Sequence, residues 1–186
     1  MRDAAHILPD RLKPGLKLVF CGTAAGRQSA LQKAYYAHKQ NKFWRTLYEV
    51  GLTPHLFEPK EYPGLWRLGI GLTDIAKYAY GMDHQLPKES LGREAAEALR
   101  ARIIKIAPCH LAFTSLTAGR AVMGKKAPVG EQKEQIGTTR IWILPRSLGL
   151  RKRAQHRSSA FTSPTRTRMA ATFSTMSAGS RRLERF

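Results

Sequence analysis

A short apolar run that leads into a glycine-containing segment is the feature that most constrains how this chain folds. Residues 17–21 are Lys-Leu-Val-Phe-Cys, and residues 22–26 are Gly-Thr-Ala-Ala-Gly. An apolar run of this length is typical of a buried strand, and glycines mark the points where regular structure is interrupted. Residues 27–38 have a composition compatible with a helix. The pattern therefore predicts a strand, a tight loop at residues 22–26 and a helix.

The alternation of strands and helices continues along the chain. The apolar pattern predicts strands at residues 110–113 and 140–144, and residues 69–73 are apolar enough to be buried. Asn41 is suited to cap a helix that stops at Gly51. Further helices are predicted at residues 59–68, at residues 93–106 and around residues 116–123. This order predicts a three-layer α/β/α fold around a central, mainly parallel sheet of four to five strands.

Positive charge is spread unevenly over the 186 residues, whose formal net charge is +19. Residues 146–186 contribute +9 of that charge, are rich in Ser, Thr and Arg, and have few aliphatic side chains. A segment of this composition buries too little surface to offset its ordering entropy. We expect a lead-in at residues 1–15, one domain at residues 16–147, and a disordered basic tail at residues 148–186.

The charge surplus also indicates the class of partner. The sequence has no apolar run of membrane-spanning length, and its first residues do not resemble a signal peptide. Cys21 and Cys109 are too few for a disulfide framework and are interpreted as reduced core thiols. We therefore expect a cytoplasmic monomer, associated with the nucleoid if the source is bacterial, that binds a polyanion, first of all nucleic acid, and no membrane.

Three segments follow predicted strands, and ligands bind at the carboxyl ends of parallel strands. They are residues 22–26, residues 114–117 and the segment after Leu144. The backbone N–H groups of residues 22–26 could bind an anion or a polarised carbonyl oxygen. A tight turn without a ligand is the alternative. The glycine spacing fits neither a dinucleotide-binding fingerprint nor a Walker loop.

Residues 35–44 combine aromatic, basic and amide side chains in ten positions. Nucleobases stack on aromatic rings while cations hold phosphates, so this mixture is typical of a nucleotide pocket. Phe43 and Trp44 fall on the predicted second helix and are interpreted as core residues. Tyr36 lies outside that helix, and we expect it to have a functional role.

These segments, in this order, resemble the uracil-DNA glycosylase superfamily, and most closely its mismatch-specific uracil/thymine-DNA glycosylase branch. The resemblance covers roughly residues 8–147, and its most specific part is the Tyr-Ala-His and Asn-x-Phe-Trp block at residues 36–44. The other residues that carry it are Leu8-Pro9-Asp10, Leu18 to Gly22, Gly26, Ser29-Ala30, Gly51-Leu52-Thr53, Gly71-Leu72-Thr73-Asp74 and Ile143-Leu144-Pro145.

The resemblance implies a DNA-repair enzyme that flips uracil out of double- or single-stranded DNA, especially from guanine mismatches. Such an enzyme hydrolyses the N-glycosidic bond without a metal or cofactor. It implies that Tyr36 stacks on the flipped base and that a hydroxyl of Thr114 or Ser115 hydrogen-bonds it, with helix capping as the alternative. The backbone amides that would stabilise the leaving base belong to Gly22, Thr23, Ala24, Ala25 and Gly26.

Two positions depart from the pattern of the branch. Ala24 stands where the mismatch-specific branch has an Asn that positions water, so Asn41 becomes the candidate for that role, with helix capping as its alternative. The last strand is followed by Pro145, Arg146, Ser147 and Leu148 instead of a Pro-Ser-rich loop, and these residues are expected to contact DNA. Other expected phosphate contacts are Arg27, Ser29 and Lys42.

Asp74 is interpreted as a cap or turn residue, with a catalytic role as the alternative. His38 and His110 are interpreted as structural histidines.

Two other functions remain open from the sequence. The chain could be a glycosylase-fold protein that binds DNA without turnover, or a general nucleic-acid binder whose basic tail dominates.

Overall fold

The structure is a computed structural model that describes residues 6–145. The predicted disordered tail at residues 148–186 therefore lies outside the described residues. The elements in chain order are β1 (Leu18–Ala25), α1 (Arg27–Gln32), α2 (Phe43–Glu49), the 3₁₀ helix η1 (Pro59–Leu68), β2 (Ile70–Tyr80), the short 3₁₀ helices η2 (Asp83–Gln85) and η3 (Lys88–Leu91), α3 (Arg93–Ile106), β3 (His110–Phe113), α4 (Leu116–Met123), β4 (Gly130–Glu131) and β5 (Arg140–Ile143).

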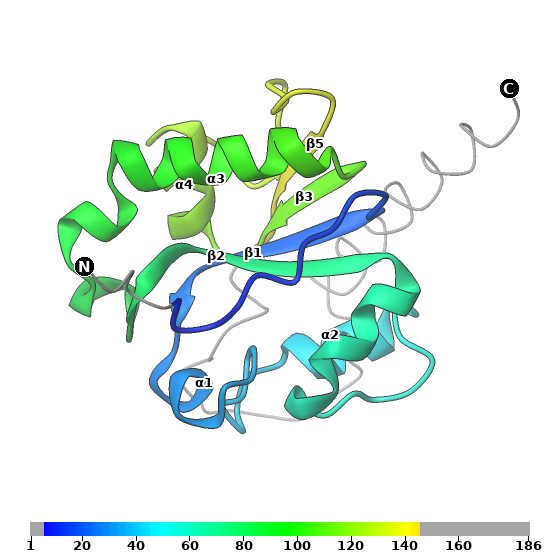
Figure 1. The fold of residues 1–186 in the computed structure, drawn as a ribbon. Helices are drawn as coiled ribbons and strands as arrows, with labels where there is room; N and C mark the ends of the chain where they lie inside the picture. Colours follow the sequence, from blue (N-terminus) through cyan, green and yellow to red (C-terminus); the bar gives the residue numbers. More distant parts are fainter. Residues whose placement is uncertain (1–5, 146–186) are drawn as a thin grey trace, which may run out of the picture.

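A five-stranded sheet forms the middle layer of the molecule, in the order β2-β1-β3-β5-β4. The pairs β1–β2, β1–β3 and β3–β5 are parallel, and only the short β4 pairs antiparallel, with β5. Figure 1 shows α3 and α4 on one face of the sheet and α1 and α2 on the other. The prediction of a three-layer α/β/α fold with a mainly parallel sheet is confirmed.

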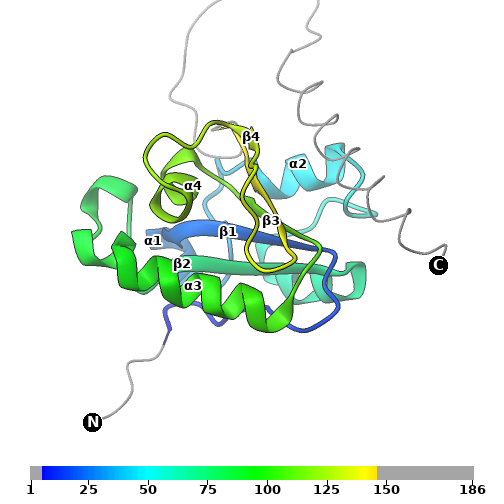
Figure 2. The same ribbon diagram turned by 90° about the horizontal axis from the view of Figure 1, so that it is seen from above.

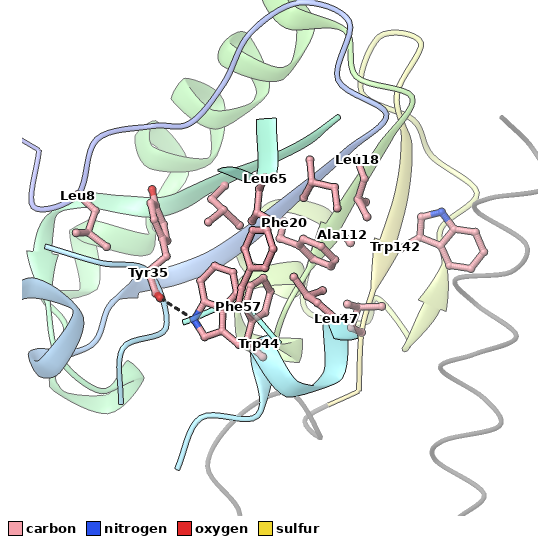
Figure 3. Packing of buried hydrophobic residues seen from close by; sticks show 14 of the residues in the cluster. Leu8, Leu18, Phe20, Tyr35, Trp44, Leu47, Phe57, Leu65, Ala112 and Trp142 are labelled. Carbon is pink, nitrogen blue, oxygen red and sulfur yellow. Dashed lines mark hydrogen bonds between the residues drawn. The ribbon is translucent and has the colours of Figure 1, made fainter. Parts of the chain in front are cut away.

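Alternate residues of the strands enter two separate cores, as the pleat of a sheet requires. Leu18 and Phe20 of β1 pack with residues of α2 and η1, whereas Val19 and Cys21 pack with residues of α3 and α4. Figure 3 shows the first of these cores, in which the indole Nε1 of Trp44 donates to the carbonyl oxygen of Tyr35 at 3.2 Å. Phe43 and Trp44 are buried, which confirms their interpretation as core residues.

Several elements have the predicted bounds because their signals are local. The helix predicted at residues 93–106 is α3, with Ala96, Leu99 and Ile103 buried at helical spacing. It ends at Ala107, whose left-handed φ of 44° precedes Pro108. The segment predicted as a helix at residues 59–68 is the 3₁₀ helix η1.

The prediction of a tight loop at residues 22–26 is wrong for its first four residues. The strand β1 continues to Ala25 because β2 is 11 residues long and pairs with it as far as the Ala25–Tyr80 pair. Only Gly26 lies outside the strand, as the N-cap residue of α1.

The helix predicted at residues 27–38 is also too long. It ends at Gln32 because Lys33 has a left-handed φ of 50°. The hydroxyl of Ser29 then accepts a hydrogen bond from the N–H of Ala37 at 3.1 Å, which folds the following residues back onto the helix. A tertiary contact thus overrides a helical composition.

The N-terminal residues run along the outer edge of β2. The N–H of Ile7 donates to the carbonyl oxygen of Lys77 at 2.8 Å, and Arg11 forms an antiparallel bridge with Leu72. This covers part of the exposed edge of the sheet. Among residues 6–145, no helix has the length and apolar character needed to cross a membrane.

Candidate active site

The carboxyl ends of β1, β2 and β3 meet at one edge of the sheet, where α1 begins (Figures 1 and 2). Gly22 of β1 is paired with Asp74 of β2, and Thr114 directly follows β3. Tyr36, in the segment between α1 and α2, joins this group because its hydroxyl donates to Thr114 Oγ1 at 3.3 Å. The structure therefore brings four separate segments together at the edge where parallel sheets bind ligands.

The end of β1 extends beyond its ladder with β3. The last β1–β3 pair is Cys21–Phe113, while the β1–β2 ladder continues through Ala25. Since alternate residues of a parallel strand direct their backbone groups to opposite neighbours, the N–H groups of residues 22–25 that face β3 are not used in that ladder. Thr23 and Ala25 are buried, and Ala24 and Gly26 are partly exposed. The N–H groups that face β2 are used in the β1–β2 ladder, so only those that face β3 are candidates to donate to a bound base.

The ring, the backbone and the hydroxyl of Tyr36 each contribute to fixing its position. Its ring stacks on Phe43, with 3.8 Å between ring centroids and an interplanar angle of 21°. Its backbone has a left-handed φ of 54°, a strained value for an aromatic residue, and its hydroxyl bonds Thr114. Burial, and secondly the nearby Asp74, raise the pKa of Tyr36 well above its usual value of 10. The hydroxyl is therefore a protonated donor, and the residue as a whole is partly exposed.

Asp74 is the residue of this site that the sequence reasoning did not select. It is neither a cap nor a turn residue, since it lies inside β2 and is only 4% exposed. Its carboxyl group closely approaches Gly22, and a methyl group at residue 22 would overlap Oδ1 of Asp74 and lie 3.4 Å from the Tyr36 hydroxyl oxygen. Glycine at position 22 makes room for this carboxyl group.

The Asp74 carboxyl group lacks the donors that buried carboxylates normally have. The carbonyl oxygen of Asp74 accepts from Arg102 and Thr73, but among residues 6–145 no hydrogen-bond donor reaches its carboxyl oxygens. Burial raises the pKa of this carboxyl group to about 7, against an attraction to Lys77 and Arg102 that lowers it. Desolvation is thus the dominant cause, as in carboxyl groups that exchange protons near neutral pH.

One sequence signal could have pointed to this residue. Asp74 is the only charged residue in residues 70–76, a run that is otherwise buried and apolar or hydroxyl-bearing. An acid inside a buried strand is costly unless it is paired or functional.

Asn41 lies at the start of α2, where its Oδ1 accepts a hydrogen bond from the N–H of Phe43 at 2.9 Å. The N-cap residue of α2 is Lys42, which has no side-chain cap hydrogen bond, so the predicted cap residue Asn41 stands one residue before the cap position and supports the start of the helix from there. The same contact ties Asn41 to the site, because Phe43 is the ring on which Tyr36 stacks. Its water-positioning role stays a prediction.

Ser115 caps α4, since its Oγ accepts from the N–H of Ala118 at 3.1 Å. The same oxygen lies 3.3 Å from Oγ1 of Thr23 in a second hydrogen bond. Thr114 Oγ1 donates to the carbonyl oxygen of Cys21 at 3.3 Å. These two hydroxyl residues join the ends of β1 and β3, and their contact with a base stays a prediction.

The predicted DNA contacts fall into three groups. Arg27 and Lys42 are exposed, at the first residue of α1 and immediately before α2. Ser29 is buried and holds Ala37, so we assign it a structural role. Pro145 is the last described residue, and Arg146, Ser147 and Leu148 lie outside the described residues.

Together these features define an α/β/α protein with a buried acid, a fixed aromatic ring and backbone donors at the carboxyl edge of its parallel sheet. A family model described as the Uracil DNA glycosylase superfamily matches residues 9–169, which is most of the chain. The protein belongs to the uracil DNA glycosylase superfamily. Membership indicates a glycosylase, a hydrolase that acts in DNA repair with DNA as its partner.

Proposed function

We propose that this protein removes uracil from DNA, including uracil opposite guanine, by hydrolysing its N-glycosidic bond. The observation that carries the proposal is the Asp74 carboxyl group, which is buried, has no donor within residues 6–145 and faces Gly22 and Tyr36. A flipped uracil would stack on Tyr36 and place its oxygens against those amides of residues 22–25 that face β3. The preference for mismatches rests on the resemblance of the loop order to the mismatch-specific branch.

In the proposed reaction, Asp74 is the general base that accepts a proton from the attacking water. As the bond between the sugar C1′ and uracil N1 breaks, its electron pair goes to the base, and backbone N–H groups stabilise the resulting negative charge. A water oxygen forms the new bond to C1′ while the Asp74 carboxylate accepts a proton from that water. The products are an abasic site and a uracil anion, whose N1 then takes up a proton from solvent while Asp74 returns its proton to solvent. A pKa of about 7 leaves a large share of Asp74 ionised at neutral pH.

Surface charge supports DNA as the partner. Eight Lys and Arg residues and no Asp or Glu lie between residues 11 and 48, the stretch that contains β1, Tyr36 and the start of α2. Arg27, Lys39 and Lys42 in this stretch are exposed. Cations at this density suit a phosphate backbone. We propose that Arg27 and Lys42 contact phosphates, together with the segment from Pro145 to Leu148.

The test is strand cleavage at abasic sites after incubation with duplexes that contain G:U, A:U or G:T, and with single-stranded uracil DNA. We expect uracil release by the intact protein, fastest from G:U. Asp74→Asn should lower the single-turnover rate by at least about 100-fold, the usual effect of losing a general base. Asp83→Asn, an exposed acid on η2, is the matched control and should keep the rate.

Ala24 favours a second candidate function, binding without turnover, because its methyl group cannot hold a water. That function predicts tight binding of uracil-containing duplex with no abasic product from the wild-type protein. Measuring binding and product on one labelled duplex separates the two functions. Binding without product contradicts the hydrolase proposal, and a full rate in Asp74→Asn contradicts the role of Asp74.

A further inference from the structure

The Asp10 carboxyl group accepts hydrogen bonds from three side chains, whereas among residues 6–145 the Asp74 carboxyl group accepts none. The Oδ1 atom of Asp10 accepts from Thr73 Oγ1 at 2.6 Å and from Lys77 Nζ at 2.7 Å, and its Oδ2 accepts from Arg102 Nη1 at 3.2 Å. The side chains of Lys77, Asp10 and Arg102 are only 5%, 18% and 23% exposed. Charge-assisted hydrogen bonds that are shielded from water in this way are strong and well ordered.

The same cations are anchored to backbone oxygens around β2. Lys77 Nζ also donates to the carbonyl oxygen of Leu8 at 2.9 Å, and Arg102 Nη2 donates to the carbonyl oxygen of Asp74 at 3.2 Å. The network therefore joins the N-terminal segment, β2 and α3 at the position of Asp74. Deleting any one charge would leave a buried partner short of its hydrogen bonds.

The two acids lie on opposite sides of β2. Thr73 and Lys77 alternate with Asp74 along the strand, so their side chains project to the face opposite that of Asp74. Asp10 bonds the first two, whereas Asp74 shares its face with Gly22. Of these two carboxyl groups, only that of Asp10 accepts hydrogen bonds from the described residues.

We propose that Asp10, Lys77 and Arg102 are positioning residues that fix the Asp74 segment of β2 and set the charge state of the Asp74 carboxyl group for hydrolysis. The inference rests on the proposed function, in which Asp74 is the base. It assigns opposite effects to the members of one network. The cations favour the reactive carboxylate form, and Asp10 opposes it.

The signs follow from the groups that surround Asp74. Burial raises its pKa most, Lys77 and Arg102 lower it, and Asp10 raises it. The other titratable groups that interact electrostatically with Asp74 are neutral, namely the hydroxyls of Tyr35 and Tyr36 and the thiol of Cys21, and burial raises the pKa of each. Removing the negative charge of Asp10 should therefore lower the pKa of Asp74, and removing a cation should raise it.

The experiment is the single-turnover rate of uracil release against pH for the full chain and its variants. In the plot of rate against pH, the rate should rise as Asp74 ionises, and we call this part of the curve the rising limb. Asp10→Asn should shift the rising limb to lower pH, and Arg102→Gln should shift it to higher pH, each by on the order of half a pH unit. The double variant should return close to the wild-type limb. A purely structural role predicts slower rates with an unmoved limb. Shifts of the same sign, or none, would overturn the inference.

Arg100→Gln is the matched control, since Arg100 is also on α3 and bonds Glu134 at 2.8 Å instead of the network. It should leave the limb in place. If Arg102→Gln does not fold, Lys77→Met removes the second cation and should also shift the limb upward.

Carboxyl-carbon NMR titration of Asp74 gives the same shifts without using activity. Opposite NMR shifts in an inactive wild-type protein would contradict the proposed function alone, whereas unmoved NMR titrations in an active enzyme would contradict only the network.

Discussion

At the scale of single residues, Asp74 combines burial, an absence of donors to its carboxyl group within residues 6–145, and close contact with Gly22. A residue selected only for stability would not have this environment, because desolvating an unpaired carboxylate is costly. The arrangement is typical of functional sites, where strain is tolerated for chemistry. It also makes the stability of the protein depend on pH in a way that can be measured.

Asp74→Asn should make the protein more stable at pH 8. The folded-state pKa of about 7 lies above the ordinary 3.8, so folding is linked to proton uptake, and the stability contributed by Asp74 falls as pH rises from about 4 to about 7. The amide variant avoids this loss, which amounts to roughly 2–4 kcal/mol for a shift of this size. Urea unfolding at pH 4 and pH 8 measures it. A variant less stable than the wild type at pH 8 would show that the carboxylate is stabilised by partners.

Gly22→Ala should destabilise the fold by about 1–3 kcal/mol, because its methyl group would overlap the Asp74 carboxyl group. Gly26→Ala is the matched control for stability, since its backbone is extended and a methyl group there meets no atom within 4 Å. In thermal unfolding, combining Gly22→Ala with Asp74→Ala should cost less than the sum of the single variants. Strict additivity would contradict the described contact.

At the scale of elements, local signals were sufficient for α3, β3 and α4, whose bounds agree with the sequence prediction. The end of β1 and the length of α1 could not be predicted in the same way. The first depends on pairing with β2, which is 45 or more residues away in the chain, and the second depends on the Ser29–Ala37 contact. The register that places Asp74 beside Gly22 is likewise a property of strand pairing, which the composition of neither strand contains.

The start of α2 offers a test that separates the two roles of Asn41. Asn41→Ala removes the acceptor for the Phe43 N–H and should cost about 1 kcal/mol of stability. Asn41→Ser keeps a capping oxygen but is too short to hold a water in the pocket. If Asn41 positions water, Asn41→Ser retains its melting temperature and loses single-turnover rate. A variant that keeps both would leave capping as the only role of Asn41.

At the scale of the whole molecule, the net charge of +19 has two sources, and residues 1–145 carry +10 of it. Within that part, the stretch from residue 11 to residue 48 concentrates eight cations without an acid. Three of the eight, Arg11, Lys13 and Lys17, precede β1, whereas the exposed Arg27, Lys39 and Lys42 lie in the segments that follow its carboxyl end. Composition thus predicted the class of partner, whereas the site depends on contacts between segments far apart in the chain.

The salt dependence of DNA binding should show whether Lys42 contacts a phosphate. If residues 11–48 line the DNA interface, Lys42→Ala should lower affinity for uracil-containing and normal duplex alike and reduce the salt slope by about one. Lys105→Ala, an exposed cation in the last turn of α3, is the matched control. Binding isotherms at several salt concentrations measure the slope. Equal slopes for both variants and the wild type would contradict a phosphate contact at Lys42.

The proposed role of Asp74 is that of the base in a uracil-releasing reaction. Its most direct test is the single-turnover rate on a G:U duplex between pH 5 and pH 9, for the wild-type protein and Asp74→Asn. We expect a wild-type rate that rises with pH and levels off above a midpoint near 7, and a variant rate that is at least about 100-fold lower and shows no such rise. A wild-type limb retained in full by Asp74→Asn would contradict it.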